Sequence, residues 1–148
     1  MDDYYYMKAA LVEARIAEKK SEIPVGAIIV IGDKVVATGH NLREQLHDAT
    51  AHAEIVAIRA ACAALGSWRL TDATMYVTLE PCAMCAGAIV NARIKRLVYG
   101  APDSVAGAVH SWFGIPFANN LNHRPEVVGG IMEDDCRKIL LEFFGKVR

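Results

Sequence analysis

Two short segments of the sequence carry residue types that together could bind a metal ion and activate water. The first reads Thr50-Ala51-His52-Ala53-Glu54, and the second reads Glu80-Pro81-Cys82-Ala83-Met84-Cys85. One imidazole and two thiolates supply three corners of a tetrahedral zinc site, and a fourth corner left to water is typical of a catalytic ion. The segments therefore predict a zinc site formed by His52, Cys82 and Cys85.

A carboxylate near this ion is the next requirement of the chemistry. Two thiolates neutralise Zn²⁺, so the ion acidifies water less than a three-histidine site would, and a nearby base must take the proton. Glu54 is the candidate because it follows His52 by two residues. On a regular helix such residues point about 200° apart. Both can reach one ion only if His52 lies at the entrance of its helix.

The Cys-x-x-Cys pair also allows other interpretations. A bare Cys-x-x-Cys is also typical of a redox pair, although the chain shows no thioredoxin-like context, or of half a structural zinc knuckle. A knuckle needs a fourth ligand, for which His40, His47 and Cys62 are the spare candidates. The His-x-Glu segment and the proline before the first cysteine favour the catalytic site. Cys62 and Cys136 are interpreted as core residues.

Composition limits the class of protein. The chain has 148 residues, of which 53% are hydrophobic and 22% charged, with a formal net charge of −1. This excludes disorder and predicts one globular domain over residues 1–148. An acidic start at Met1-Asp2-Asp3 does not fit a secretory signal, so a cytoplasmic protein with reduced thiols is expected. The near-neutral charge neither favours nor excludes nucleic acid.

Hydrophobic periodicity predicts the elements that must position the two segments. They are a helix from about Met7 that ends before Ser21, a hairpin of strands Val25–Ile31 and Lys34–Gly39, a buried helix Ala51–Leu65, a strand Ala73–Leu79, a buried helix Pro81–Asn91 with Pro81 at its first position, a strand Ile94–Gly100, an edge strand at Val127-Val128 and a helix from Met132 to about Lys146. This order predicts an α/β fold of three layers, α/β/α. Its mixed five-stranded sheet opens with the antiparallel hairpin and continues with parallel strands. The buried helices would begin together beyond the carboxyl ends of strands, where open sheets bind ligands.

The segments His52-Ala53-Glu54 and Pro81-Cys82-Ala83-Met84-Cys85 resemble the signature of zinc-dependent nucleobase deaminases. Further stretches are similar to the bacterial branch that acts on tRNA, and the likeness covers nearly the whole chain. These stretches are Pro24-Val25-Gly26-Ala27, Val77 to Cys82, Met84 to Ala88, Asn122-His123-Arg124 and Phe143-Phe144. The resemblance implies a cytidine-deaminase-like fold and hydrolytic deamination of the wobble adenosine of a tRNA anticodon loop to inosine.

The resemblance also implies roles for individual residues. His52, Cys82 and Cys85 would bind one Zn²⁺ per subunit, and Glu54 would carry a proton from the activated water to adenine N1. The remaining substrate-binding residues would be Asn41, the Ala53 backbone N–H, Asp103, Asn122, His123, Arg124 and Phe144. Members of this branch resemble one another in being homodimers whose RNA groove uses both subunits.

Recognition of an RNA loop requires a basic rim and an aromatic platform. Rim candidates are Arg43, Arg93, Lys95, Arg96, His123, Arg124, Lys146 and Arg148. One of Phe143 and Phe144 is expected to pack in the core and the other to meet RNA. The chain departs from the tRNA branch at Ala49, where proline is usual. It departs again at Val109-His110-Ser111-Trp112, where a small, glycine-rich loop is usual, so the fit of the flanking nucleotides is expected to differ.

Two alternatives remain beside the tRNA deaminase. A free nucleobase or nucleoside deaminase, acting on guanine or cytosine, would use the same fold and zinc chemistry and differ only in pocket and rim. A zinc-stabilised RNA-binding module without catalysis would share the metal ligands. Glu54 argues against that module, because a carboxylate has no structural duty at such a site.

Overall fold

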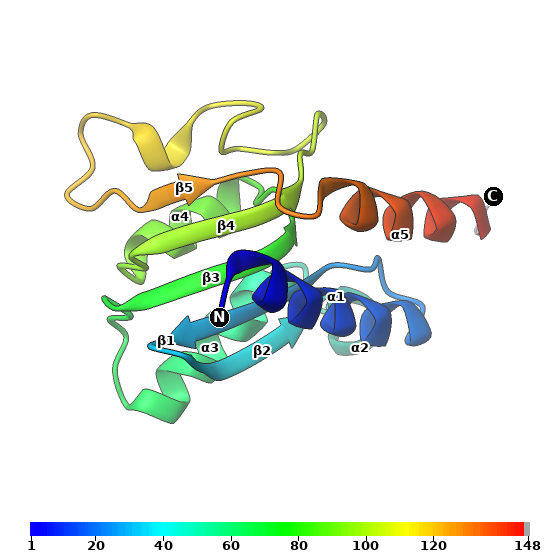
Figure 1. Ribbon diagram of the computed structural model, residues 1–148, viewed down its shortest axis with the longest axis horizontal. Coiled ribbons are helices and arrows are strands. Elements are labelled where there is room, and N and C mark those ends of the chain that lie inside the picture. Colours follow the sequence, from blue (N-terminus) through cyan, green and yellow to red (C-terminus); the bar gives the residue numbers. More distant parts are fainter. Residues whose placement is uncertain (147–148) are drawn as a thin grey trace.

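The computed structural model describes residues 1–146, which form a mixed five-stranded sheet with helices on both faces (Figure 1). The helices are α1 (Asp3–Lys19), α2 (Arg43–Leu46), α3 (Ala53–Leu65), α4 (Ala83–Asn91) and α5 (Glu133–Lys146), with a 3₁₀ turn η1 at Ile115–Phe117. The strands are β1 (Gly26–Ile31), β2 (Lys34–His40), β3 (Ala73–Leu79), β4 (Arg96–Ala101) and β5 (Glu126–Val128), in the order β2-β1-β3-β4-β5. The predicted fold class is confirmed.

The strand directions follow from the connections between the strands. A two-residue turn makes β1 and β2 an antiparallel hairpin, and β1 also pairs antiparallel with β3. Helix α4 then carries the chain back across the sheet, so that β3 and β4 are parallel, and β5 continues parallel to β4. Because β2 and β3 point the same way, both of their carboxyl ends lie at one end of the sheet.

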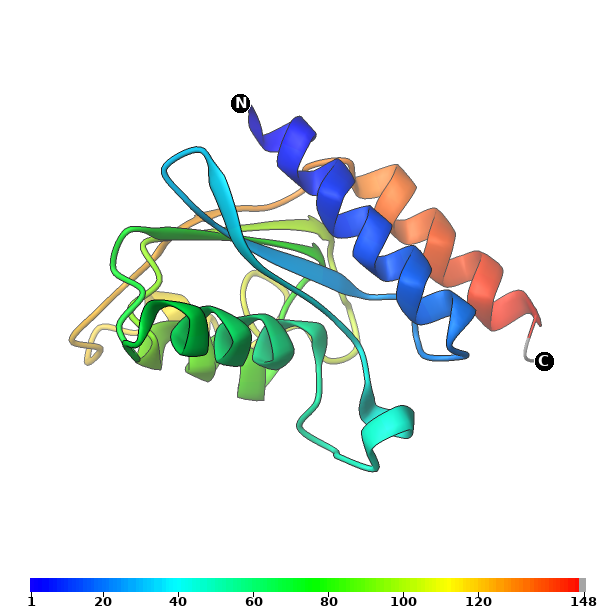
Figure 2. The same cartoon turned by 90° about the horizontal axis from the view of Figure 1, so that it is seen from below.

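Two apolar layers fix the helices to the sheet. Helices α3 and α4 cover one face, while α1 and α5 lie side by side over the other (Figure 2). Beneath α3 and α4 the core is built from side chains such as Ile29, Met75 and Leu97. Beneath α1 and α5 it includes Met7 and Cys136. Burial on both sides explains why the strands read as nearly continuous apolar runs.

The start of α4 differs from its prediction. The helix begins at Ala83, and Cys82 is its N-cap, with φ −75° and ψ 178°. Pro81 therefore lies outside the helix and not at its first position. The carbonyl of Cys82 already accepts the first helical hydrogen bond, from Ala86 at 2.8 Å. Because the backbone of Cys82 is extended, its side chain does not point in the direction that a helical residue at this position would have.

The two cysteines outside the motif differ in burial. Cys136, a residue of α5, is fully buried between this helix and the sheet, as predicted. Cys62 is only partly buried, and its Sγ lies 3.8 Å from the carbonyl oxygen of Trp68 at the end of α3. Its assignment to the core was therefore only partly right.

Arg96, one of the candidates for an RNA rim, has a structural partner. Its guanidinium donates two hydrogen bonds to the Asp3 carboxylate, at 2.7 and 2.8 Å, and Tyr76 Oη donates a third at 2.8 Å. These bonds attach the first turn of α1 to the sheet. Such bidentate, charge-assisted pairs are among the stronger polar contacts in proteins.

The Asp3→Asn variant is expected to lose about 1–2 kcal/mol of unfolding free energy near neutral pH, because the pair is partly shielded from water. Hydrogen bonding to Arg96 holds the pKa of Asp3 below its usual 3.8, against the effect of burial. The contribution is therefore present above that pH and is lost as pH falls through the lowered value. Urea titrations at neutral and acidic pH should show the two proteins converging. Asp33→Asn, in the exposed hairpin turn, is the control.

Within residues 1–146, the helices are too short or too polar for any of them to cross a membrane.

Candidate active site

His52 occupies the position that the chemistry demands. It is the N-cap of α3, with φ −71° and ψ 155°, and the helix begins at the next residue. Because the backbone of His52 is extended, its side chain does not follow the 100° rotation per residue of the helix. The ring of His52 and the side chain of Glu54 can therefore face the same cavity. The condition that His52 lie at the helix entrance is confirmed.

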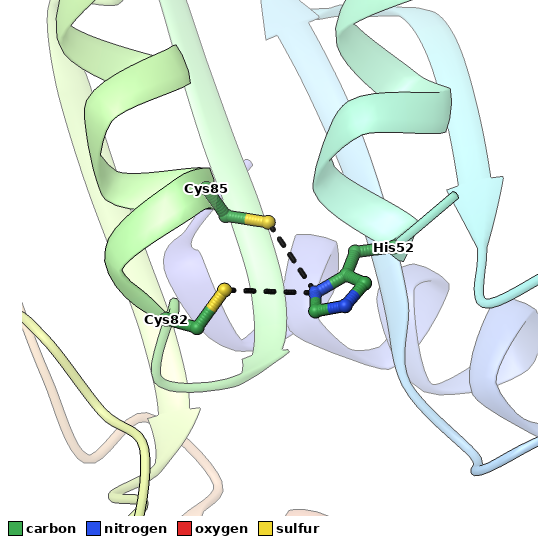
Figure 3. A group of neighbouring side chains, drawn as sticks. All are labelled: His52, Cys82 and Cys85. Atoms are coloured by element: carbon green, nitrogen blue, oxygen red, sulfur yellow. Dashed lines mark hydrogen bonds between the residues drawn. The ribbon is translucent and has the colours of Figure 1, made fainter. Parts of the chain in front are cut away.

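The imidazole of His52 and the two thiols converge between the starts of α3 and α4 (Figure 3). His52 Nδ1 lies 3.6 Å from both Cys82 Sγ and Cys85 Sγ. Among the described residues, these three form the group of side chains that could hold a metal ion, with all ligand atoms within 4.8 Å of one another. Each start follows a strand that ends at the same end of the sheet, as the fold predicts.

The spare ligands of the knuckle interpretation lie elsewhere. His40 is engaged by Glu13 Oε1 at 3.0 Å and Lys20 Nζ at 2.9 Å. His47 ends the short helix α2, and Cys62 turns toward Trp68. In residues 1–146, no fourth protein ligand joins the cluster, which leaves a coordination position for water or substrate.

Hydrogen bonding divides the two thiols electrostatically. Cys82 Sγ accepts hydrogen bonds from Cys85 and from His52. These bonds lower the pKa of Cys82 well below its usual value, although the thiol is partly buried. The same contact with Cys82, together with burial, raises the pKa of Cys85. A hydrogen bond to Cys82 also raises the pKa of His52. Cys82 is thus the thiol of the pair that more readily becomes a thiolate, the form in which cysteine binds a metal ion.

Glu54 is a buried carboxyl group in the same cavity. Only 4% of the residue is exposed, and burial raises its pKa to about 7, helped by the nearby charge of Cys82. A carboxyl group whose pKa lies near the working pH can both accept and return a proton. Its environment therefore suits proton transfer.

A cavity of about 200 Å³ opens over the cluster. Its walls come from the segment before β1, the ends of β2 and β3, the starts of α2, α3 and α4, and the loop after β4. The lining residues are Ile23, Val25, Asn41, Arg43, His52, Ala53, Glu54, Leu79, Glu80, Cys82, Asp103 and Ala106. The sequence-based candidates Asn41, Ala53 and Asp103 thus share one cavity with Glu54 and with two of the potential metal ligands, His52 and Cys82. Arg43 is the basic side chain among them.

Asn41 is held in a fixed orientation at this wall. Its side-chain N–H donates to the Ile23 carbonyl at 3.3 Å, and its Oδ1 accepts from Arg43 N at 3.1 Å. Ala53 provides the first N–H of α3, which has no acceptor within the helix. Both groups are placed where a polar edge of a ligand could meet them.

The segment Asn122-His123-Arg124 lies at the other end of the sheet. His123 Nε2 contacts the Ile94 carbonyl at 2.7 Å, and Glu126 pairs with Arg96 at the start of β4, whereas Asp103 follows the end of that strand. In Figure 1 this loop precedes β5, away from the starts of α3 and α4. The other rim candidates Arg93 and Lys95 lie at the same far end, because they precede β4. The role of this segment in RNA binding stays a prediction that this chain's own cavity does not explain.

The aromatic pair on α5 also differs from its expectation. Neither ring is buried in the core: Phe144 is 40% exposed, and Phe143 is half-buried against a second cavity. That cavity shares Asn41 and Arg43 with the first. Lys146 is exposed on the last turn of α5, and Arg148 lies outside the described residues. The structure thus places Phe143, and not the predicted Phe144, beside the candidate site.

Two buried carboxylates were missed by the sequence reasoning. Glu22 accepts hydrogen bonds from Glu44 N at 3.1 Å and Gln45 N at 2.8 Å, and so holds α2 beside the cavity. Glu80 precedes Pro81 and binds the loop after β4. Its position directly after a buried strand, at the ligand-binding end of the sheet, is the signal that could have identified it.

Gly39 sets the distance between α3 and the sheet. A Cβ at this position would lie 2.5 Å from the Ala53 carbonyl oxygen and 2.6 Å from Ala57 N, both backbone atoms. The start of α3, which carries His52 and Glu54, can approach β2 only because residue 39 has no side chain.

The Gly39→Ala variant is therefore expected to lose about 1–3 kcal/mol of unfolding free energy, because α3 must move outward. Chemical denaturation measures this loss, and bound metal should fall with it as His52 shifts. Gly87→Ala is the matched control, since a Cβ there meets no atom within 4 Å and alanine favours the helix. Equal stabilities of the two variants would contradict this account.

The fold and the site together define a class of protein. The family model of the MafB19-like deaminases matches residues 1–148. A solved structure described as that of guanine deaminase from Bacillus subtilis has 40% sequence identity and a TM-score of 0.66, and covers 69% of this chain and 66% of its own. The chain is thus a deaminase with a cytidine-deaminase-like fold.

More similar relatives narrow this class. The tRNA-specific adenosine deaminase of Bacillus subtilis (strain 168) is 47% identical over 146 residues, covering 99% of this chain and 91% of the relative. A structure from studies of A-to-I editing by tRNA:A34 deaminases at the wobble position is 48% identical, with a TM-score of 0.89, and covers 92% of this chain and 99% of its own. The chain belongs to the MafB19-like deaminases and, within them, to the family of tRNA-specific adenosine deaminases.

Proposed function

We propose that the protein hydrolyses the wobble adenosine of a tRNA anticodon loop to inosine with the help of one Zn²⁺ per chain. The observation that carries this proposal is the buried Glu54 carboxyl group, which lies in one small cavity with His52 and Cys82, two of the three potential metal ligands. The relatives that act on tRNA support the choice of substrate. The substrate and the free thiols fit a cytoplasmic enzyme.

The donor set fits zinc. A tetrahedral Zn²⁺ with bonds of about 2.0 Å to nitrogen and 2.3 Å to sulfur separates these two ligand atoms by about 3.5 Å. His52 Nδ1 lies 3.6 Å from each Sγ, close to this separation. When bound, the ion would polarise a water molecule and lower its pKa toward neutrality.

Glu54 would move the protons of the reaction. It accepts a proton from the attacking water and delivers it to N1 of the adenine ring as oxygen bonds to C6. The same carboxyl group then transfers the proton of the new C6 hydroxyl to the exocyclic nitrogen. The C6–N bond breaks, ammonia leaves, and C6=O remains. A pKa raised by burial supports both transfers.

Asn41 and the Ala53 N–H would orient the nucleotide. The C6 atom of a stacked base cannot be reached, so the nucleotide must be splayed out of the loop into the cavity. The fixed amide of Asn41 and the free N–H at the start of α3 can bind its polar groups. Arg43, in the same wall, is placed to meet phosphate.

We further propose that the enzyme is a homodimer. The distance between Asn122-His123-Arg124 and the cavity of the same chain supports this proposal, because another chain could bring that segment to the RNA. Light scattering at micromolar concentration should give twice the chain mass of 16.1 kDa. A mass of one chain would contradict it.

The decisive experiment offers the zinc-loaded protein an anticodon stem-loop with adenine at the wobble position, and measures inosine by nuclease digestion and mass spectrometry. Free adenosine, cytidine and guanine are assayed in parallel. Inosine in the stem-loop supports the proposal. The likeness to guanine deaminase favours one alternative, and conversion of guanine without conversion of the stem-loop would replace the proposal by that activity.

A further inference from the structure

The carboxylate of Glu80 is buried and fully engaged by one loop. The residue is 2% exposed and follows the last residue of β3. Oε1 accepts from Asp103 N at 3.0 Å and from Ser111 Oγ at 2.5 Å. Oε2 accepts from Val109 N at 3.0 Å and from Ser111 N at 2.9 Å. Each oxygen therefore receives two donors.

The loop over residues 102–111 is shaped around this carboxylate. A Cβ at Gly107 would lie 2.5 Å from Glu80 Cδ, so the loop can close over Glu80 only with glycine there. Ala108 N also donates to the Pro81 carbonyl at 2.8 Å. The loop is thus anchored to the two residues that precede Cys82.

The inner side of the same loop lines the catalytic cavity. Asp103 and Ala106 are part of its wall. Asp103 Oδ1 accepts from Val105 N at 3.0 Å and from Ala106 N at 3.2 Å, which fixes the turn that carries both wall residues. Anchoring of the loop therefore sets the shape of the cavity opposite Asn41.

The bulky residues of this loop contribute to its anchoring. His110 Nδ1 lies 2.7 Å from Tyr99 Oη, and Trp112 Nε1 donates to the Ser104 carbonyl at 2.8 Å. Val109 is buried in the core. None of Val109, His110 and Trp112 lines the cavity. Glu80 joins the loop to the end of β3, directly before the potential metal ligands.

We infer that Glu80 is a positioning residue, which holds loop 102–111 in place as a wall of the cavity before the substrate enters. The inference rests on the proposed function for the substrate, but the anchoring itself does not. A wall that is already in place spares binding the cost of ordering a loop. Loss of the anchor should therefore weaken substrate binding more than it slows the chemical steps, which depend on Glu54.

The test variant is Glu80→Gln, which keeps the shape of the side chain. With the amide NH₂ at the Oε2 position, the N–H groups of Val109 and Ser111 lose their acceptor. With the NH₂ at the Oε1 position, Asp103 N loses its acceptor, while the Ser111 hydroxyl can rotate to accept. Either orientation also removes the negative charge that strengthens the remaining bonds. Amide hydrogen exchange at Asp103, Val109 and Ser111 should become about tenfold faster, as expected for loss of charge-assisted bonds. The KM for the stem-loop should rise about tenfold, while kcat changes less than about threefold and zinc content stays the same.

Two further variants complete the experiment. Glu126→Gln, at an exposed carboxylate at the other end of the sheet, is the control and should change none of these values. Ser111→Ala removes only the hydroxyl donor and should give a smaller change in the same amides. It also decides the matter if Glu80→Gln does not fold.

Unchanged exchange at all three amides would overturn the inference, as would a fall in kcat with KM unchanged, since Glu80 would then act on Cys82. If the wild-type protein converts no stem-loop, the proposed function fails. The exchange comparison then still decides whether Glu80 anchors the loop.

Discussion

Glu54→Gln is expected to lose about three orders of magnitude or more in the rate of inosine formation, because in the proposed mechanism one carboxyl group performs every proton transfer. Glutamine matches the size of glutamate and is neutral, so it is cheaper to bury. The variant should therefore fold with equal or higher stability and keep its metal. Single-turnover kinetics with the stem-loop, zinc analysis and thermal unfolding measure these three properties.

Glu126→Gln makes the same chemical change at an exposed position far from the cavity and should retain wild-type turnover. Near-normal turnover by Glu54→Gln would remove Glu54 from the proton path. Loss of zinc in that variant would instead mean that Glu54 supports the metal ligands.

Cys82→Ala is the second substitution with a large expected effect. It removes one of the three potential metal ligands, while the side chain makes no capping hydrogen bond to α4. Bound zinc should fall below about a tenth of an equivalent, and the melting temperature by several degrees, because metal affinity is linked to folding. Inosine formation should be lost in proportion to the zinc.

Cys62→Ser is the control for this experiment, because Cys62 is partly buried on α3 and turned toward Trp68. It should retain full zinc by elemental analysis. Unchanged zinc in Cys82→Ala would refute the assignment of this thiol as a ligand.

The sheet was predictable because its strands are buried on both faces. The bounds of Ala73–Leu79 match β3, and the hairpin turn at Gly32-Asp33 was identified from its residues. Helix starts were less accurate. The apolar pattern of the first helix begins at Met7, but α1 begins at Asp3 because the Asp2 side chain caps it at Tyr5 N, at 2.9 Å. Local capping, which periodicity does not register, decided these bounds.

The convergence of His52, Cys82 and Cys85 was predictable because their residue types are few and their spacing is specific. The roles of Glu22 and Glu80 were not predictable. A glutamate is expected to be exposed unless it is paired, and the sequence does not show its partners. Their partners are backbone N–H groups of α2 and of loop 102–111. Those segments have no periodic pattern, so only the folded chain reveals the contacts.

The same limit applies to Asn122-His123-Arg124. Resemblance identified these residues as important, but the distance to the cavity depends on strand order and direction. A sequence motif names residue types, and the topology decides whether they meet within one chain.

The extended backbone at His52 implies a trade-off between helix stability and turnover. A substitution that raises the helix propensity at Thr50, such as Thr50→Ala, would favour an earlier first turn of α3. His52 would then become an interior residue, and its ring would rotate away from the carboxyl group two positions later. Directed selection for thermal stability in this segment should thus yield proteins with a higher melting temperature and a lower turnover rate. Selection for turnover should instead retain the extended backbone at His52.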